Sequence, residues 1–205
     1  MGTLTLEEVR ALAQSGKYKK VPLTRQILSD IRTPLEVLRI MQNISDHCFL
    51  LESVEDQVQW GRYTFLGFDP DMELTCTDHK MCISAGGKIR MTTTHPAKYI
   101  RQLIRENRSP KIEGLPPFTG GLVGDFSYDY IKYSEPKLRL DEKNEFGFSD
   151  MDLMLFNKLI AFDNLAQKMI LIVNISTSNP EIQYNRGIME LDNIERLVRE
   201  GVPGR

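Results

Sequence analysis

The segment from residue 48 to residue 92 limits the fold most strongly, because it holds a series of short apolar and β-branched runs separated by turn residues. Runs of this length predict strands, and Gly86-Gly87 predicts a tight turn between two of them. Strands joined by such short turns pair in antiparallel fashion. We expect strands at residues 48–51, 62–68, 72–77, 80–84 and 88–92.

Strong helix signals flank this strand region. Thr5 and Glu8 form a capping-box pattern, in which a threonine side chain and a glutamate side chain cap the first turn reciprocally. Thr33 and Glu36 repeat the pattern, and Pro34 occupies the favoured first helical position. Helices are therefore expected to begin near residues 6, 34, 96 and 180.

The second half of the chain continues the mixture of strands and helices. We expect strands over Gly121–Tyr130, Leu153–Phe162 and Lys168–Ile175, the last two joined by a turn around Asp163-Asn164. Strands and helices do not alternate regularly, which argues against a parallel sheet. The pattern predicts an α+β fold, with largely antiparallel β-sheets and packed helices.

Composition favours a soluble protein without an anionic partner. The chain of 205 residues has a formal net charge of −2, and its basic residues are scattered, so nothing favours nucleic acid or an anionic membrane. The longest apolar run, 169–173, is too short to span a bilayer, and no secretory signal is visible. Three cysteines without disulfide spacing are typical of reduced thiols, so we expect a cytoplasmic location.

One cysteine pattern is typical of metal sites. Cys76, His79 and Cys82 have the spacing C-x2-H-x2-C, and two thiolates with an imidazole could begin a zinc site. The pattern falls across an expected hairpin turn, and no second ligand pair follows it. Small, half-buried strand cysteines are the favoured interpretation, so no metal is assigned to the chain.

A set of recognition-type side chains gathers near residues 52–65. A strand ends in Glu52-Ser53, and the next strand opens with Arg62 and carries Tyr63 and Phe65. A carboxylate, a hydroxyl, a guanidinium and two rings could bind a zwitterionic amino acid. Alternatively, Glu52 and Arg62 form a cross-strand ion pair while the rings fill the core, which the residue types favour.

A second unusual segment spans residues 116–136. Gly120, Gly121 and Gly124 in an expected strand suggest close approach of another backbone or a bulge. After this strand pattern, Tyr128, Tyr130 and Tyr133 are interspersed with the charged residues Asp129 and Lys132. The segment could be a ligand wall, but a core strand is the safer interpretation.

Together these segments resemble the chorismate-utilising enzyme family, specifically the N-terminal region of anthranilate synthase component I. The resemblance lies in LLES at residues 50–53 followed by Glu55, in GRYTF at 61–65, and in GGLVGDFSYD at 120–129. The family's entry into its second helix is matched by Pro22, Asp30, Thr33 and Pro34. Asp125 departs from the pattern, since an aromatic residue is usual there, and a lone buried carboxylate would be costly.

The resemblance implies a pocket for L-tryptophan, used for feedback inhibition in tryptophan biosynthesis. Ser53 would hydrogen-bond the bound amino acid, with Glu52 beside it. The neighbouring strand wall would be formed by Arg62, Tyr63, Thr64 and Phe65.

The resemblance also implies that residues 1–205 form the N-terminal regulatory domain, without the C-terminal chorismate-binding catalytic domain. The complete enzyme would be a magnesium-dependent lyase that converts chorismate and ammonia to anthranilate and pyruvate. A glutamine amidotransferase subunit, component II, would supply the ammonia. This chain would be inactive by itself and bind no cofactor, and its exposed sheet edges favour association with itself.

Two alternatives stay open at this point. One is the corresponding half of aminodeoxychorismate synthase component I from the folate pathway, which shares the fold. The other is an interaction domain for the amidotransferase subunit without a ligand of its own. The match from Pro22 to Pro34 favours anthranilate synthase.

Overall fold

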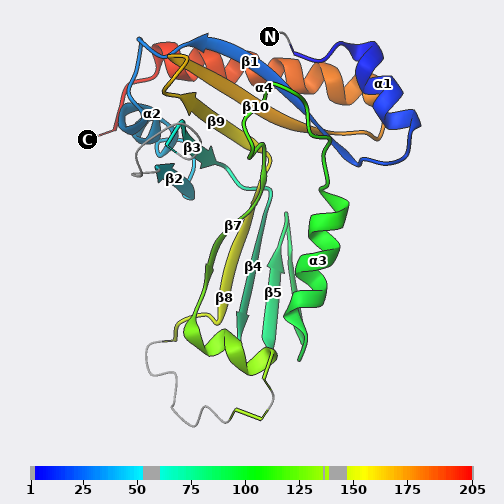
Figure 1. The fold of residues 1–205 in the computed structure, drawn as a ribbon. Helices are drawn as coiled ribbons and strands as arrows, with labels where there is room; N and C mark the ends of the chain where they lie inside the picture. Colours follow the sequence, from blue (N-terminus) through cyan, green and yellow to red (C-terminus); the bar gives the residue numbers. More distant parts are fainter. Residues whose placement is uncertain (1–2, 53–60, 136, 139–146, 205) are drawn as a thin grey trace. The chain divides into compact units, whose positions relative to one another are not determined.

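The computed structural model describes residues 3–52, 61–135, 137–138 and 147–204. The chain divides into two compact units. The first comprises the chain up to Asp69, residues 107–120 and the chain from Asn157 onward, and the second comprises residues 70–106 and 121–156. Each unit is built on one antiparallel sheet with helices (Figure 1), which confirms the expected α+β class.

The sheet of the first unit has the strand order β1-β10-β9-β3-β2, and every adjacent pair is antiparallel. The strands are β1 (Lys20–Leu28), β2 (Cys48–Glu52), β3 (Tyr63–Phe68), β9 (Lys158–Asp163) and β10 (Lys168–Ser176). The helices are α1 (Leu6–Gln14), α2 (Pro34–Met41) and α4 (Pro180–Glu200).

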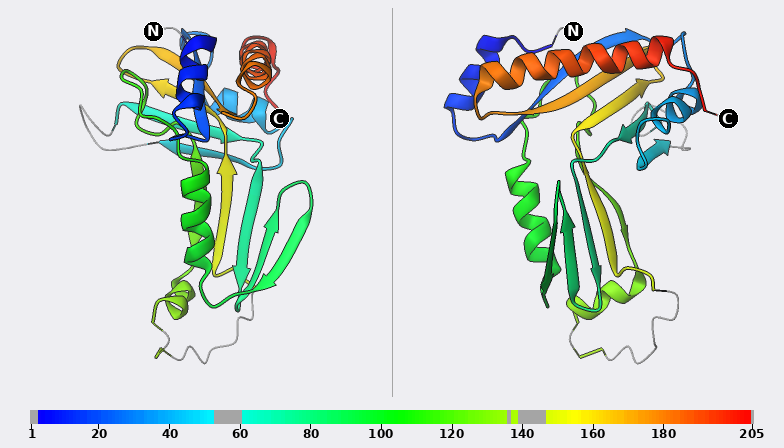
Figure 2. Two further views of the ribbon diagram at one scale, coloured as in Figure 1. Left: turned by 90° about the vertical axis from the view of Figure 1, so that its right-hand side faces the viewer. Right: turned by 180° about the vertical axis from the view of Figure 1, so that it is seen from behind.

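One face of this sheet packs against the three helices to form the core of the first unit. Figures 1 and 2 show α4 lying along β1 and β10. Alternate residues of these strands point toward the helices, because side chains alternate between the two faces of a strand. Buried side chains of this core include Leu23, Leu171, Ile160, Leu66 and Leu191.

Both predicted capping boxes are present at the starts of α1 and α2. The Thr33 hydroxyl accepts the Glu36 backbone N–H, while the Glu36 carboxylate accepts the Thr33 backbone N–H. Val37, Ile40 and Met41 form the buried stripe of α2. Leu35 and Ile44, which the periodicity also assigns to that stripe, are 63% and 51% exposed. Ile44 is exposed because the helix already ends at Met41, whereas the exposure of Leu35 in the first turn has no such explanation.

Strand β1 is absent from the sequence-based prediction. Its nine residues combine Pro22, Arg25 and Gln26 with apolar residues, so they show no clean alternation. The strand forms because it pairs with β10 in continuous register, from Lys20 opposite Ser176 to Leu28 opposite Lys168. This long-range pairing has no local sequence signal.

The sheet of the second unit has the strand order β6-β5-β4-β8-β7. Its strands are β4 (Met72–Thr77), β5 (Lys80–Ser84), β6 (Lys88–Thr92), β7 (Gly121–Phe126) and β8 (Met151–Phe156). Helix α3 (Pro96–Glu106) and a 3₁₀ helix, η1 (Tyr128–Tyr133), pack against one face. The buried residues there are Leu74, Cys76, Met81, Met151 and Leu153.

Two predicted strands need correction. The strand expected over residues 121–130 ends at Phe126, and the tyrosines that follow lie on the 3₁₀ helix. The strand expected over residues 153–162 is two strands that belong to different sheets, with Asn157 between them. Apolar residues continue on both sides of Asn157, and a continuous apolar run does not reveal where a strand ends.

The glycine-rich strand β7 lies close to the neighbouring backbone, as predicted. Gly124 has φ +157°, and a Cβ atom there would lie 2.0 Å from the carbonyl oxygen of Asp152 on β8. The adjacent Asp125 is exposed on this edge strand, so its carboxylate is not buried. The departure from the family pattern therefore has no desolvation cost.

Gly124→Ala should destabilise the fold by at least about 2 kcal/mol, because the new methyl group meets backbone that can move only if the strands separate. Gly87→Ala is the matched control, since a Cβ there meets no atom within 4 Å. Urea unfolding followed by circular dichroism measures both changes. Equal stability of the two variants would contradict the close approach.

Candidate functional site

The predicted ligand residues lie at one end of the β2–β3 hairpin in the first unit. Glu52 is the last residue of β2 and lies opposite Thr64 of β3. Arg62 directly precedes β3, and Tyr63 and Phe65 are its first and third residues. Ser53 lies outside the described residues. β2 is one of the two edge strands of the sheet in the described residues, and Glu52 is exposed.

Strand alternation divides these residues between the two faces of the sheet. Tyr63 and Phe65 share one face, because they are two positions apart. Thr64 and its cross-strand partner Glu52 lie on the other face, where Leu66 and the helices pack. Thr64 is 1% exposed and lies opposite Phe162 of β9.

The face opposite the helices carries a cluster of aromatic rings. The Phe65 and Phe118 rings meet edge to face at 5.6 Å between centroids, and Tyr63 lies 5.9 Å from Phe65. Phe49 approaches Phe118 and covers Gly67, where a Cβ would lie 2.1 Å from the Phe49 ring. Phe118 comes from residues 107–120, so this loop contributes to the aromatic cluster.

Arg62 forms a two-point ion pair with Asp163 at the end of β9. Its Nε and Nη2 atoms lie 3.0 and 2.6 Å from the two carboxylate oxygens. The cross-strand ion pair between Glu52 and Arg62, the alternative interpretation of the sequence, is wrong. Glu52 lies opposite Thr64, and among the described side chains Arg62 forms its ion pair with Asp163. The hydrogen bonds from Arg62 hold the pKa of the buried Asp163 carboxyl below its ordinary value of 3.8, although burial opposes this.

A pocket of about 290 Å³ lies beside these residues on the helix-covered face. Phe162 and Asn164 line it, together with the segment that leads from β1 into α2. Thr64 is the cross-strand neighbour of Phe162, and Asn164 donates its backbone N–H to the carbonyl of Arg62 at 2.9 Å. Its lining residues are Ser29, Asp30, Ile31, Arg32, Thr33, Pro34, Glu36, Phe162, Asn164 and Gln167.

The sheet register relates this pocket to the predicted residues. Glu52, Thr64 and Phe162 form one row across β2, β3 and β9. Adjacent strands lie about 4.8 Å apart, so Glu52 is about 10 Å from Phe162. Among the described residues, Glu52, Arg62 and Thr64 lie near the pocket but do not line it, and Thr64 is its nearest neighbour in the register. The Arg62 guanidinium contacts Asp163 and Tyr63, which alternate to the other face of the sheet.

The sequence analysis did not predict Phe162 or Asn164 as pocket residues, because they are distant in sequence from the hairpin. Thr33 and Pro34 belong to the segment from Pro22 to Pro34 that resembles the family.

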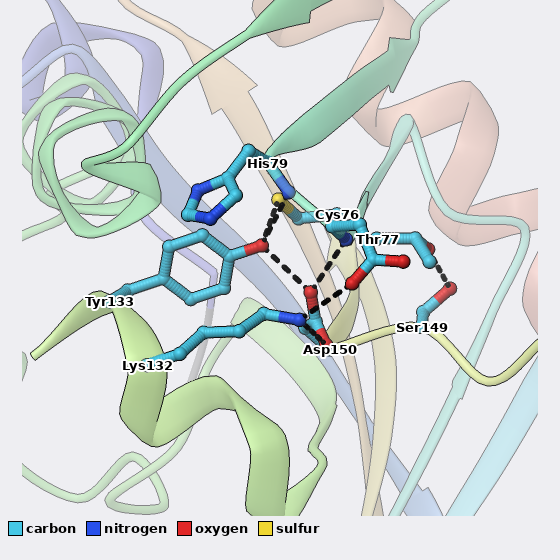
Figure 3. Close-up of polar contacts among 8 residues, drawn as sticks. Cys76, Thr77, His79, Lys132, Tyr133, Ser149 and Asp150 are labelled. Carbon is cyan, nitrogen blue, oxygen red and sulfur yellow. Dashed lines mark hydrogen bonds and ion pairs between the residues drawn. The ribbon is translucent and has the colours of Figure 1, made fainter. Parts of the chain in front are cut away.

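The second unit holds a separate buried polar cluster (Figure 3), which the sequence patterns did not predict. Asp150 is 2% exposed and accepts hydrogen bonds from Lys132 Nζ, the Tyr133 hydroxyl and the Asp78 backbone N–H, at 2.7 to 2.8 Å. The Tyr133 hydroxyl also accepts the His79 backbone N–H at 2.9 Å. Lys132 and Tyr133 lie on the 3₁₀ helix, so the cluster joins this helix to the β4–β5 turn.

The titration behaviour of this cluster favours a structural role. Burial raises the pKa of the Tyr133 hydroxyl, and its contacts with Cys76 and Asp150 act in the same direction. Burial also raises the pKa of the Cys76 thiol, so the reactive thiolate is scarce at neutral pH. Burial opposes ionisation of Lys132, but its hydrogen bonds to Asp150 and Asp78 give it a raised pKa.

The possible zinc ligands do not converge. Cys76 lies opposite Met81 on β5, so Cys82, one position further along, points to the other face of the sheet. The imidazole of His79 stacks edge to face against Tyr133. Throughout the described residues, no three His, Cys, Asp or Glu side chains are placed to hold a metal ion. No helix in the described residues is long and apolar enough to cross a membrane.

Comparisons with known proteins place the chain in a family context. No protein-family model matches it. Anthranilate synthase component 1 of Acinetobacter calcoaceticus is 36% identical over 200 residues, which cover 95% of this chain and 40% of that protein. The proteins of the same name from Pseudomonas aeruginosa and Acetivibrio thermocellus are 33% and 31% identical, over 97% and 96% of the chain. The chain is homologous to the N-terminal part of anthranilate synthase component 1.

A solved structure agrees at the level of the fold. The crystal structure of anthranilate synthase component I from Streptococcus pneumoniae TIGR4 superimposes with a TM-score of 0.57. The match covers 86% of this chain and 37% of that one, at 22% sequence identity. In both comparisons the match is partial, and the chain spans about 40% of the length of the curated relatives that it matches.

Asp150→Asn should destabilise the fold by about 2 to 4 kcal/mol, because it leaves partly buried Lys132 without one of its two carboxylate partners. Asp129→Asn is the matched control, since Asp129 is exposed on the same 3₁₀ helix. Chemical unfolding measures both. A loss no larger than that of the control would contradict the structural role of Asp150.

The Arg62–Asp163 pair should make stability depend on pH. The folded-state pKa of Asp163 is lowered, so its contribution is present above the unfolded value of about 3.9 and is lost as pH falls through the folded value. We expect the difference in unfolding free energy between the natural chain and Asp163→Asn to be constant near neutrality and to shrink below about pH 4. Urea unfolding between pH 7 and pH 3 measures it, and a constant difference would contradict the pairing.

Proposed function

We propose that this chain is the N-terminal regulatory part of an anthranilate synthase and that it binds L-tryptophan. The observation that carries the proposal is the pocket lined by Thr33, Pro34 and Phe162, since Thr64 lies opposite Phe162 in the sheet register. Homology to the N-terminal part of anthranilate synthase component 1 supports it. The relatives from Acinetobacter calcoaceticus, Pseudomonas aeruginosa and Acetivibrio thermocellus carry the anthranilate synthase name, which favours the proposal over the aminodeoxychorismate synthase alternative.

The chemistry of the pocket suits an aromatic amino acid. At 290 Å³ the pocket is near the lower end of the usual volumes for small-ligand sites. Seven of its ten described lining residues are polar or charged, and these can bind the charged end of an amino acid. Ile31, which is 39% exposed, and Pro34 offer apolar surface to an indole ring. The charged end of the ligand extends beyond the residues that line the pocket, where Ser53 and Arg62 bind the carboxylate and Glu52 binds the ammonium group. The two signs of charge match a zwitterion.

Binding here regulates activity only through a difference between two states. Tryptophan must bind one conformation of the whole protein more tightly than another, and the coupling free energy equals that difference in affinity. The remaining length of the relatives corresponds to the part that converts chorismate and ammonia to anthranilate and pyruvate with magnesium. An amidotransferase subunit supplies the ammonia, and residues 1–205 are the sensing domain.

Titration of the chain with L-tryptophan, followed by calorimetry and by amide NMR shifts, tests the proposal. Shifts are expected at Glu52, Thr64 and Phe162. Ser53→Ala should weaken the affinity about tenfold, because a hydrogen bond to a charged group is lost. Ser84→Ala, in the second unit, should leave it unchanged. Absence of binding, or equal affinities for the natural chain and Ser53→Ala, would contradict the assignment.

A further inference from the structure

Asp163 contacts Arg62 through only one edge of the guanidinium group. The Nε and Nη2 atoms donate to the Asp163 carboxylate at 3.0 and 2.6 Å. An arginine has five N–H donors in a planar fork, so the Nη1–Nη2 edge keeps donors that this pair does not use. Among the described residues, Nη1 has no hydrogen-bond partner, and the Arg62 side chain is 38% exposed. This edge matches the two oxygens of a second carboxylate.

Asp163 is itself held rigidly. Its side chain is 5% exposed, and its Oδ1 atom accepts the backbone N–H of Ala166 at 3.0 Å. The turn after β9 therefore fixes the carboxylate before it contacts Arg62. On the other side, the guanidinium lies 4.9 Å from the centre of the Tyr63 ring. A long, flexible side chain is thus fixed from two directions.

Fixing Arg62 in advance reduces the entropic cost of binding. An arginine side chain that is mobile before binding loses rotamer entropy when it contacts a ligand, and this loss weakens the affinity. Arg62 loses much of this freedom on folding, because Asp163 and Tyr63 hold it. The ligand then meets a guanidinium edge that is already oriented.

We propose that Asp163 is a positioning residue that holds Arg62 for the carboxylate group of the bound amino acid. This inference rests on the proposed function, because it takes Arg62 as a ligand contact. Asp163 touches no ligand in this arrangement and acts through Arg62. The pair therefore links the β9–β10 turn to the binding site at the start of β3.

Two effects of Asp163 on ligand binding have opposite signs. Its negative charge repels a carboxylate ligand, so by Coulomb interaction alone Asp163→Asn would tighten binding. Its role in positioning predicts the reverse, since the released Arg62 must be ordered again when the ligand binds. The direction of the change in affinity therefore identifies which effect dominates.

The experiment compares L-tryptophan with L-tryptophanamide, which lacks the carboxylate, on the natural chain and on Asp163→Asn. We expect Asp163→Asn to weaken L-tryptophan binding about three- to tenfold, the cost of ordering one long side chain again. Binding of the amide should not change, which a general loss of structure would not explain. Circular dichroism checks that both chains are folded.

Arg62→Lys provides the second variant, on a side chain that is partly exposed. Lysine keeps the positive charge but cannot donate from two edges, so L-tryptophan binding should weaken again. Adding Asp163→Asn to Arg62→Lys should cause no further loss. If the natural chain binds no tryptophan, the proposed function fails. If it binds and Asp163→Asn binds as well or better, or if Arg62→Lys has no effect, only the positioning role is wrong.

Discussion

The pairing of β1 with β10 is the interaction on which the first unit depends. Lys20–Leu28 and Lys168–Ser176 lie about 150 positions apart in sequence, yet they pair over nine residues without a bulge. The ladder provides two adjacent strands of the face on which α1 and α4 pack. Since an extended strand buries little surface unless another element covers it, the ladder and the helix core must form together.

Local signals predicted the parts of the fold that local interactions determine. The strands β4, β5 and β6 and both capping boxes lie where the sequence places them, because turn residues and caps act over a few positions. β1 was missed because distant pairing stabilises it. The 3₁₀ helix was also missed, because its tyrosines are typical of a strand. The helix is held by hydrogen bonds from Lys132 and Tyr133 to Asp150, which is distant in sequence. Such partners cannot be found from a local pattern.

The candidate site follows the same division. Glu52, Arg62, Tyr63, Thr64 and Phe65 were predicted from their residue types and from the family resemblance, and the hairpin brings them to one end of the sheet. Their division between two faces follows from strand alternation once the register is known. The partner of Arg62 and the pocket residue Phe162 come from β9, about one hundred residues later. No spacing rule connects residues so far apart.

The strand order of the first sheet also implies a gradient of local stability. β10 and β9 lie inside the sheet, and their amides are covered on both sides, so their hydrogen exchange requires extensive unfolding. β2 is an edge strand with one neighbour in the described sheet, so its amides exchange after less extensive unfolding than those of β9 and β10. The candidate site thus includes residues of an edge strand and of an interior strand of one sheet. A ligand that contacts β2 and β9 together would raise the free energy needed to open β2. Slower amide hydrogen exchange in β2 would therefore report its binding.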